Sequence, residues 1–463
     1  MSAFEIEGAS RAAETGGDDR WSRRFGLTTG LLLVVANMIG TGVFTTTGFL
    51  VRDVPSVPAV LIAWGIGGVV ALCGALTYAE LARAYPNNGG EYHLLTKIYG
   101  PSLGFLSGCS AFIAGFSAPI AVSSMAFAKY LGDTVGGVPA LPVATGLVIV
   151  LALLQMKSAM IGARFQNVFT FGKLALIVGF IVAGCLFADW SYLTPTARLS
   201  VGTAIVSPEL AVGLVYISFT YSGWNAAAYV AGELQNPNRT VPLALVGGTL
   251  TVMLLYVGLN VVFLASAPIE RLAGQVDIGH VAAENLFGRA AGSGMSLIIA
   301  VGLVSTVGAM MIAGPRVYEA IGWDYPKLAV LRKRSADGSP VVAILIQAVI
   351  AIGLIASMKF EELLRFIGVT LSIFSILTVI GVFVVRRRLV GRTAGGFAVW
   401  KSIPPLLFIA LESWMIWHTV RSDPMVLVVT VAVLAAALGL YFVVRGDSNL
   451  VSGICDQADS TDE

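Results

Sequence analysis

Residues 31–51 read LLLVVANMIGTGVFTTTGFLV, and this stretch decides the fold class. It belongs to a run over 27–50 that carries no charge and is long enough to cross a bilayer, which takes about 20 mostly apolar residues. Gly40-Thr41-Gly42 nevertheless lies near its centre, and each unpaired backbone group inside a membrane costs several kcal/mol. The stretch therefore predicts a membrane-spanning helix that is interrupted near its middle.

The composition agrees with a membrane protein. Apolar residues make up 56% of the 463 residues and charged residues only 12%, against roughly 25% in soluble domains. So few charges cannot cover a water-exposed surface, which excludes a typical soluble enzyme, a disordered protein and a secreted disulfide scaffold. The net charge of +2 is too small to indicate a nucleic-acid partner.

Residues that could carry catalysis or hold a metal are sparse. The four cysteines show no paired spacing and the three histidines are far apart, so we expect no catalytic residues, no metal site and no cofactor. The spans contain no HExxH motif and no repeated filter motif of the kind that a channel uses. A membrane amino acid sensor stays an alternative, although both tails are short for an output domain.

Twelve stretches are long and apolar enough to span a bilayer, which predicts an all-α integral membrane protein with 12 transmembrane helices. They are 27–51, 57–82, 99–131, 139–156, 165–188, 208–232, 241–266, 291–320, 340–358, 362–385, 403–420 and 424–444. We expect short surface helices in the connection over 267–290 and polar tails over 1–24 and 446–463. If the N-terminus lies inside, most of the 29 lysines and arginines lie inside too. This bias predicts a multi-pass protein of the cytoplasmic membrane with both termini in the cytoplasm.

A second interruption is predicted in the sixth span. Residues 211–234 read AVGLVYISFTYSGWNAAAYVAGEL, with Ser222-Gly223 at the centre beside Trp224 and Asn225. Small residues also let helices pack closely, so each motif alone has a packing explanation. Two interruptions at corresponding places in two halves instead indicate a transporter built as an inverted repeat, with its substrate near the midplane.

The two interruptions offer complementary chemistry. Where the first helix restarts, the amides of Thr41, Gly42 and Val43 would suit a carboxylate, because a helix N-terminus carries free N–H donors and partial positive charge. Where the sixth helix stops, unpaired carbonyls of Phe219, Thr220 and Ser222 would suit an ammonium group. An amino acid carries both groups. The candidate substrate-binding residues are Ile39, Gly40, Thr41, Gly42, Val43, Phe219, Thr220, Ser222, Gly223 and Asn225.

Three stretches also carry a resemblance to a known family. They are NMIGTGVF (37–44), ALTYAELARAYPNNGGEYHLLTKIYGPSLGFLSG (75–108) and SFTYSGWNAAAYVAGELQNPNRTVPLA (218–244). The sequence resembles the amino acid–polyamine–organocation (APC) superfamily of transporters, and within it the L-type amino acid transporter branch and its bacterial relatives. The resemblance implies a LeuT-like fold with a five-plus-five inverted repeat, discontinuous helices 1 and 6, and alternating access. The implied parts are 25–200 and 201–390 for the two repeats and 391–445 for two added helices.

The resemblance also implies roles for single residues. Phe219 would be the aromatic gate above the substrate, and Trp224 and Asn225 match positions near the pocket. Lys173, alone inside its span, would put an ammonium group where relatives bind sodium between helices 1, 5 and 8. That implies sodium-independent transport. Whether Lys173 is a fixed cation, carries a coupling proton or reaches another partner stays open.

The substrate class follows from the absence of an acid at the centre of the expected pocket spans 1, 3, 6, 8 and 10. We therefore expect neutral amino acids, small ones ahead of large ones, moved by an exchanger or a proton-coupled carrier. A cationic amino acid or polyamine carrier is the alternative. The outer loop over 131–140 has no cysteine, so we expect no disulfide-linked accessory subunit, and the protein to be a monomer or homodimer.

Four glutamates need an explanation in this scheme. Glu412 in the eleventh span lies outside the inferred core, which favours a structural pair or an oligomer contact. Glu80, Glu91 and Glu233 lie near inner ends of spans. They would form either an inner gate of ion pairs or a solvated rim, with Arg83, Lys97 and Arg239 as the basic residues nearby.

Overall fold

The computed structural model describes residues 26–85, 89–137, 139–157, 159–194, 201–231, 234–335, 338–390 and 399–447. Within these ranges it omits the side chains of 159–170, 389–390, 399–400 and 447. The tail over 1–24, most of the tail over 446–463 and Glu233 therefore lie outside the described residues. The regular elements that the described residues form are all helical.

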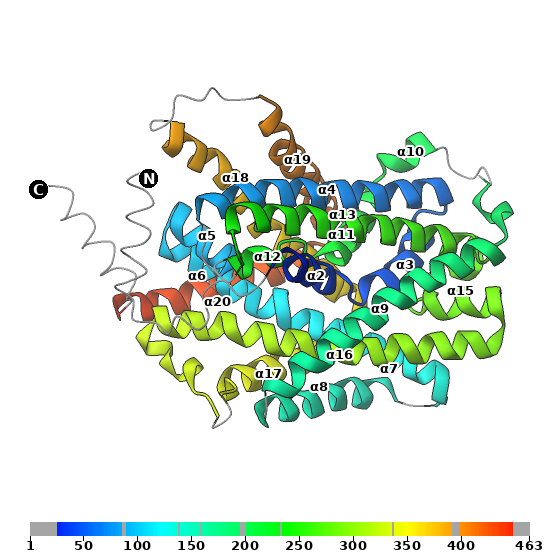
Figure 1. The fold of residues 1–463 in the computed structure, drawn as a ribbon, viewed down its shortest axis with the longest axis horizontal. Helices are drawn as coiled ribbons and strands as arrows, with labels where there is room; N and C mark the ends of the chain where they lie inside the picture. The colour runs from blue at the N-terminus through cyan, green and yellow to red at the C-terminus, as the bar shows by residue number, and fades with distance from the viewer. Residues whose placement is uncertain are drawn as a thin grey trace, which may run out of the picture.

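Each of the twelve predicted stretches is found as a helix or as consecutive helical pieces, with ends that differ by a few residues. Long helices run along the long axis of the molecule (Figure 1). The elements up to the sixth stretch are α2 (Leu27–Met38), η2 (Gly42–Phe44), α3 (Thr46–Asp53), α4 (Val57–Ala84), α5 (Gly90–Tyr99), α6 (Pro101–Ser110), η3 (Ala111–Ser117), α7 (Ala118–Val135), α8 (Ala140–Lys157), α9 (Ala159–Phe187), η4 (Trp190–Leu193), α10 (Val201–Ile205), α11 (Pro208–Tyr221) and α12 (Ala226–Tyr229). The later elements are α13 (Pro237–Leu264), α14 (Ile269–Leu272), α15 (Ile278–Phe287), α16 (Arg289–Asp324), η6 (Pro326–Arg332), α17 (Val341–Ser357), α18 (Phe360–Val390), η7 (Val399–Ser402), α19 (Ile403–Ser422), α20 (Pro424–Val444) and η8 (Arg445–Asp447).

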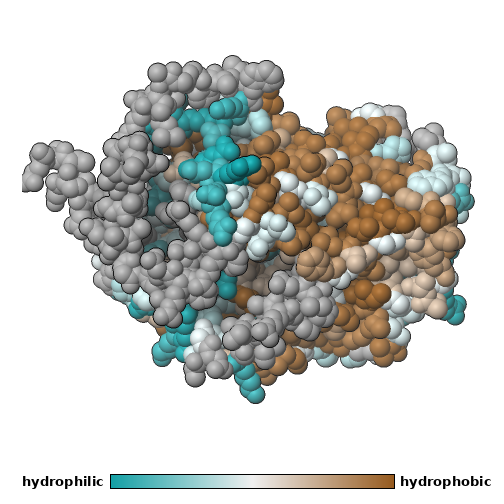
Figure 2. Space-filling view, in the orientation of Figure 1, coloured by the Kyte–Doolittle hydropathy of each residue, from teal (hydrophilic) through white to brown (hydrophobic). Residues whose placement is uncertain are grey.

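The described part of the chain contains eight helices that are long and apolar enough to cross a membrane. Shorter apolar helices, α2 and α17 among them, add to these. Figure 2 shows hydrophobic side chains over most of the face between the two ends of the molecule, with hydrophilic ones gathered toward the end where α5 lies. This surface is that of a multi-pass membrane protein, because apolar side chains facing outward over such an area need lipid around them. We call the two ends the α5 end and the α15 end.

Both predicted interruptions are confirmed. α2 ends at Met38 and helical structure resumes only at Gly42, while α11 ends at Tyr221 and α12 begins at Ala226. Gly223 has φ +95°, a left-handed backbone that residues with a side chain rarely adopt. A Cβ atom there would lie 2.9 Å from the carbonyl oxygen of Asn37. Glycine is needed at this position because the two interruptions touch each other.

The third predicted stretch contains a change of helix type. α6 passes into the π-helical segment η3 and then into α7. The hydroxyl of Ser117 donates to the carbonyl of Phe112 five residues earlier at 2.9 Å, and the hydroxyl of Tyr318 donates to the same carbonyl at 2.8 Å. Such wide turns are often found at functional sites.

The helices predicted for the connection over 267–290 are present as α14 and α15. They are only partly at the surface, because Leu272 and Ile278 are fully buried. The amide of Gly274 donates to the carbonyl of Gly48 on α3 at 2.7 Å. This connection therefore helps to close the α15 end.

Ion pairs also hold the α15 end closed. Two hydrogen bonds of 2.9 and 3.0 Å run from the guanidinium of Arg52 on α3 to the carboxylate of Glu361 on α18. Arg365, one turn further along α18, donates to the hydroxyl of Tyr216 on α11 at 2.8 Å. Phe49, Val212 and Tyr216 belong to the apolar cluster at this end. The interrupted helices α3 and α11 are thus both fastened to α18.

Reversing the charge of Arg52 should loosen this end. In an otherwise cysteine-free chain carrying Val212→Cys, Arg52→Glu places two carboxylates together, and labelling of Cys at 212 by a polar maleimide should rise. Half-exposed ion pairs contribute about 0.2–1 kcal/mol, so a rise of up to about fivefold is expected.

The matched control is the exchanged pair, Arg52→Glu with Glu361→Arg, which should bring labelling back toward its starting rate. Equal labelling in all three proteins would contradict the closure by this pair.

Candidate functional site

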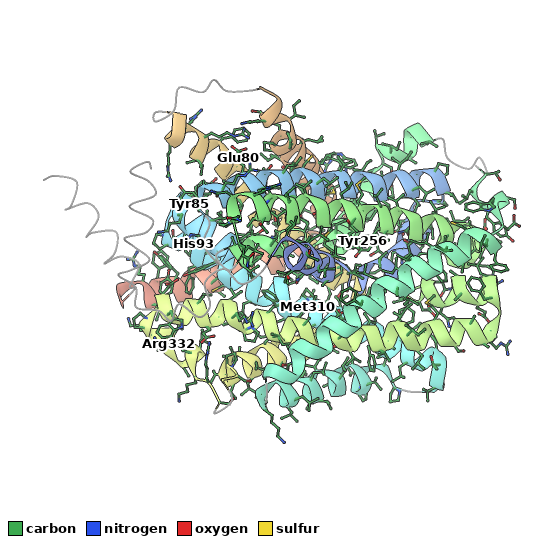
Figure 3. The ribbon with its side chains drawn as sticks, viewed as in Figure 1. Glu80, Tyr85, His93, Tyr256, Met310 and Arg332 are labelled. Carbon is green, nitrogen blue, oxygen red and sulfur yellow. The ribbon has the colours of Figure 1, made fainter. Side chains whose placement is uncertain are left out.

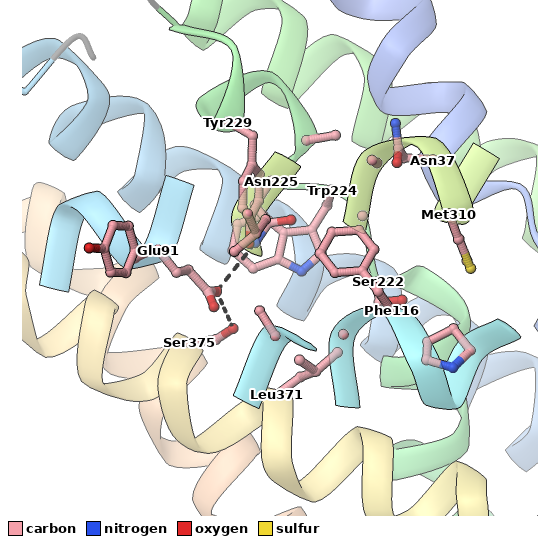
Figure 4. A pocket seen from close by; sticks show the side chains of 18 of the residues that line it. Asn37, Glu91, Phe116, Ser222, Trp224, Asn225, Tyr229, Met310, Leu371 and Ser375 are labelled. Atoms are coloured by element: carbon pink, nitrogen blue, oxygen red, sulfur yellow. Dashed lines mark hydrogen bonds between the residues drawn. The ribbon is translucent and has the colours of Figure 1, made fainter. Parts of the chain in front are cut away.

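A cavity of about 430 Å³ lies beside the two interruptions. Its wall includes Asn37 from α2, Phe116 from η3 and Met310 from α16, and it reaches Gly89 and Glu91 at the α5 end (Figure 4). None of its lining residues comes from α3, α10 or α15. The cavity therefore extends from the interruptions toward the α5 end and is closed toward the α15 end.

The carbonyls freed at the first interruption have donors from neighbouring helices. The hydroxyl of Tyr256, fully buried on α13 near the middle of the molecule (Figure 3), donates to the carbonyl of Met38 at 2.6 Å. The ammonium of Lys173 on α9 lies 3.4 Å from the carbonyl of Ile39 and 2.5 Å from the hydroxyl of Thr306 on α16. Lys173 thus connects α9 with α16 and with the first interruption, where it binds the free carbonyl of Ile39.

The amides that follow the first interruption, unlike its carbonyls, have no hydrogen-bond partner in the described chain. Among the described residues, no hydrogen-bond acceptor is found for the amides of Thr41, Gly42 and Val43. The hydroxyl of Thr41 instead makes a 2.6 Å hydrogen bond with that of Ser123 on α7. An open set of consecutive N–H donors suits an anion.

These residues lie behind the cavity wall rather than on it. Ile39, Thr41 and Val43 are buried, and a Cβ atom at Gly42 would lie 2.9 Å from Cα of Thr220. The cavity lining therefore holds only part of the predicted set. Of the predicted residues, those outside the lining are Ile39, Gly40, Thr41, Gly42, Val43 and Thr220, and those on it are Phe219, Ser222, Gly223, Trp224 and Asn225.

The second interruption differs in one detail from the prediction. The carbonyl of Phe219 accepts the amide of Ser222 at 2.9 Å, because the chain closes a tight turn after α11. Its carbonyl was expected to be unpaired, and that expectation is wrong. The carbonyls of Thr220 and Ser222 receive no donor in the part of the chain that the structure describes.

Asn225 ties this interruption to a buried acid. Its side-chain amide donates to Oε1 of Glu91 at 3.2 Å, and the hydroxyl of Ser375 donates to the same oxygen at 3.0 Å (Figure 4). The hydroxyl of Tyr78 also donates to this oxygen, at 2.5 Å. Glu91 is 6% exposed and lines the cavity. It is therefore neither part of a described ion-paired gate nor of a solvated rim.

Glu412 also lines the cavity, which corrects its placement outside the core. Its two carboxylate oxygens accept the hydroxyls of Ser218 on α11 at 3.0 Å and Ser372 on α18 at 2.6 Å. The premise that the pocket contains no acid is thus wrong. Sequence reasoning missed both acids because they come from α5 and α19, outside the spans expected to form the pocket.

Glu80 pairs with Arg386 rather than with one of the basic residues expected near it. Arg386 on α18 donates to both its carboxylate oxygens at 2.7 Å, whereas Arg83 donates to the backbone carbonyl of Asn238 at 2.9 Å. Glu80 and Arg386 are 306 positions apart, so no local signal connects them. In the part of the chain that the structure describes, the expected pairs of Glu80 or Glu91 with Arg83, Lys97 or Arg239 are not found.

The described residues contain no group of three or more histidine, cysteine, aspartate or glutamate side chains that could hold a metal ion. The arrangement is instead that of a binding cavity. It has apolar and aromatic walls, a few convergent polar groups, and two interrupted helices beside it.

Comparisons with known proteins agree with this geometry. The family model described as amino acid permease matches residues 25–444. The serine/threonine exchanger SteT of Bacillus subtilis (strain 168) is 27% identical over 435 residues, which cover 92% of this chain and 97% of that protein. The human b(0,+)-type amino acid transporter 1 is 28% identical over 377 residues, 79% of this chain and 76% of its own.

The human large neutral amino acids transporter small subunit 2 is 24% identical over 465 residues, which cover 95% of this chain and 83% of that protein. The family match spans the interrupted helices, the cavity and both buried acids. The chain belongs to the amino acid permease family of the APC superfamily, and is a multi-pass membrane transporter rather than an enzyme.

Proposed function

We propose that this protein is a secondary transporter of L-amino acids that works by alternating access without sodium. The observation that carries the proposal is the meeting of two interrupted helices, with open amides on one and open carbonyls on the other, beside a 430 Å³ cavity. An amino acid is small, and its α-carboxylate and α-ammonium groups match these two sets of backbone groups.

The proposed architecture is a LeuT-like five-plus-five inverted repeat of twelve spans. Its parts are residues 25–200, 201–390 and 391–445. Packing supports a division into two moving parts, because α13 packs on α2 and α4, whereas α16 packs on α7, and α8 packs on both α7 and α17. In this scheme the first group rocks against the second. Phe219 and Trp224, both on the cavity wall, act as gates.

The α5 end is proposed to face the cytoplasm of the cell membrane, with both termini on that side. The excess of basic residues in the segments expected there supports this orientation. In this orientation the cavity opens toward the cytoplasm, and the ion pair of Arg52 and Glu361 closes the opposite, outer end. We further propose that no disulfide-linked accessory subunit is required and that the protein is a monomer or homodimer.

In the proposed cycle the substrate carboxylate binds the amides of Thr41, Gly42 and Val43, and its ammonium binds the carbonyls of Thr220 and Ser222. Gly42 lies directly against Thr220 in the structure. A small opening between the two interruptions would bring both sets of groups to the substrate. Asn225 holds the second interruption through Glu91.

The prediction of neutral substrates depended on a pocket without acids. Glu91 and Glu412 on the cavity wall remove that reason. Transport itself is tested by counterflow of a labelled amino acid into liposomes that hold purified protein and an unlabelled amino acid. Runs with and without a pH gradient separate exchange from proton coupling. Absence of saturable counterflow for all twenty amino acids would contradict the proposal.

Replacing Gly42 by alanine should weaken substrate binding at least about tenfold, or about 1.4 kcal/mol. The added Cβ would overlap Thr220 and fill the space between the two interruptions that the substrate has to enter. Binding is measured on purified protein in detergent by thermal shift against amino acid concentration.

The control is Gly146→Ala on α8, where a Cβ meets nothing within 4 Å. Its affinity should equal that of the unchanged protein. Unaltered affinity in the Gly42 variant, with normal folding, would exclude the clamp.

Lys173 is proposed to take the place of a sodium ion between α2, α9 and α16. Uptake into liposomes should therefore be the same with and without a sodium gradient. Lys173→Met leaves the carbonyl of Ile39 without its donor, and transport should fall at least about tenfold, since an unpaired buried polar group costs about 1–3 kcal/mol.

Lys157→Met, which changes an exposed lysine at the end of α8, serves as the control and should transport normally. Uptake that follows the sodium gradient would refute the assigned role.

A further inference from the structure

Glu412 lies on the buried face of α19, where an apolar residue would be expected. The buried residues of this helix recur every three or four positions and are Pro405, Phe408, Glu412, Met415 and Thr419. Only 3% of the glutamate is exposed. An acid inside a membrane protein is costly and usually serves a function with a definable partner.

The carboxyl group of Glu412 is hydrogen-bonded, but it has no basic partner among the described residues. Ser218 and Ser372 supply one hydroxyl donor to each oxygen, and both donors are uncharged. Among the described residues no lysine, arginine or histidine forms an ion pair with Glu412. Since an ionised carboxylate can accept about four hydrogen bonds, acceptor capacity is left for a further donor.

Glu412 can be reached from the cavity. Glu412 is a lining residue together with Phe408, one turn before it on α19, and Trp224. The rings of Trp224 and Phe408 pack edge to face at 6.0 Å. A cation that reached Glu412 from the cavity would therefore also lie near aromatic rings, which attract positive charge.

The other charged groups on the wall do not neutralise it. Glu91 is a second acid, and one of its oxygens already accepts hydrogen bonds from Tyr78, Asn225 and Ser375. Arg316 is exposed, and no ion pair joins it to either acid in the described chain. Neither acid on the wall has a basic partner among the described residues, and they differ in their donors: three polar groups hold a single oxygen of Glu91, whereas each oxygen of Glu412 accepts only one serine hydroxyl.

Glu412 also lies close to the proposed substrate position. Its donor Ser218 directly precedes Phe219 on the wall, and its other donor Ser372 directly follows Leu371, which is a lining residue too. A substrate held at the two interruptions would thus have this carboxylate within the same cavity, on the side formed by α18 and α19.

We propose that Glu412, positioned by Ser218 and Ser372, is the specificity residue that binds the cationic side-chain group of a basic amino acid such as lysine or arginine. This inference rests on the proposed function and names its substrate class. The ammonium or guanidinium group would supply the charge that Glu412 lacks. A charged hydrogen bond made in a desolvated site discriminates strongly against a substrate that lacks the donor.

The test compares L-lysine with L-norleucine, which has the same chain without the ammonium group, in counterflow by the purified full chain in liposomes. The unchanged protein should prefer lysine. Glu412→Gln should lower lysine transport at least about tenfold and norleucine transport by less than about threefold, because only the charged contact is lost.

Two further variants keep the test decisive. Glu209→Gln, at an exposed glutamate in the first turn of α11, should leave both substrates unchanged. Glu412→Asp retains the charge one methylene further back and should keep a reduced preference for lysine. If Glu412→Gln does not fold, the aspartate variant and lysine-induced thermal stabilisation of the unchanged protein decide the question.

The outcomes separate the two proposals. Counterflow of no amino acid at all contradicts the proposed function. Counterflow of neutral amino acids, with lysine and arginine neither transported nor competing, leaves that function standing and overturns the role of Glu412. An equal loss of lysine and norleucine in Glu412→Gln also overturns it, since Glu412 would then serve the α-ammonium group or a coupling proton.

Discussion

Every backbone group inside the hydrocarbon layer needs an internal hydrogen-bond partner, and this requirement decides how both interruptions are built. At the first interruption, Tyr256 and Lys173 satisfy the carbonyls of Met38 and Ile39, while the amides that follow stay open. At the second, the tight turn after α11 satisfies the carbonyl of Phe219, whereas the carbonyls of Thr220 and Ser222 receive no donor among the described residues. The two interruptions therefore expose opposite poles of the peptide group, and neither pole needs a charged side chain.

The two ends of the molecule are closed by different means. At the α15 end, ion pairs of Arg52 and Arg365 cover an apolar cluster, and the connection over 267–290 packs against α3. At the α5 end, the cavity separates the elements, although Glu80 and Arg386 join α4 to α18 through two short hydrogen bonds. Alternating access would have to exchange which end is sealed. The groups that seal the α15 end are partly exposed charges, which break at moderate cost.

The sequence was informative where structure depends on local composition. The length of the apolar stretches predicted the helices, and Gly40 and Gly223 predicted the interruptions. Both signals are local, because the residues that carry them lie in the elements concerned. Assignments failed where residues far apart in the chain decide the outcome. Glu91 and Glu412 come from α5 and α19, and only tertiary packing brings these helices to the cavity. The carbonyl of Phe219 was misjudged because its acceptor role depends on the turn that follows, whose geometry composition does not reveal.

The π-helical segment η3 has a consequence for how insertions and deletions act on this protein. A π turn holds one more residue than an α turn, so η3 offsets the angular register of α7 relative to α6. Removing one residue from 111–117 would restore an ordinary helix and leave the residues beyond it at the same angular positions, because the wide turn accommodates the extra residue. Pro119 would then stay on the cavity wall, and only residues within the wide turn, such as Phe116, would change their place on it. A change of one residue in the length of η3 would therefore alter the cavity wall locally, without turning the helix that follows.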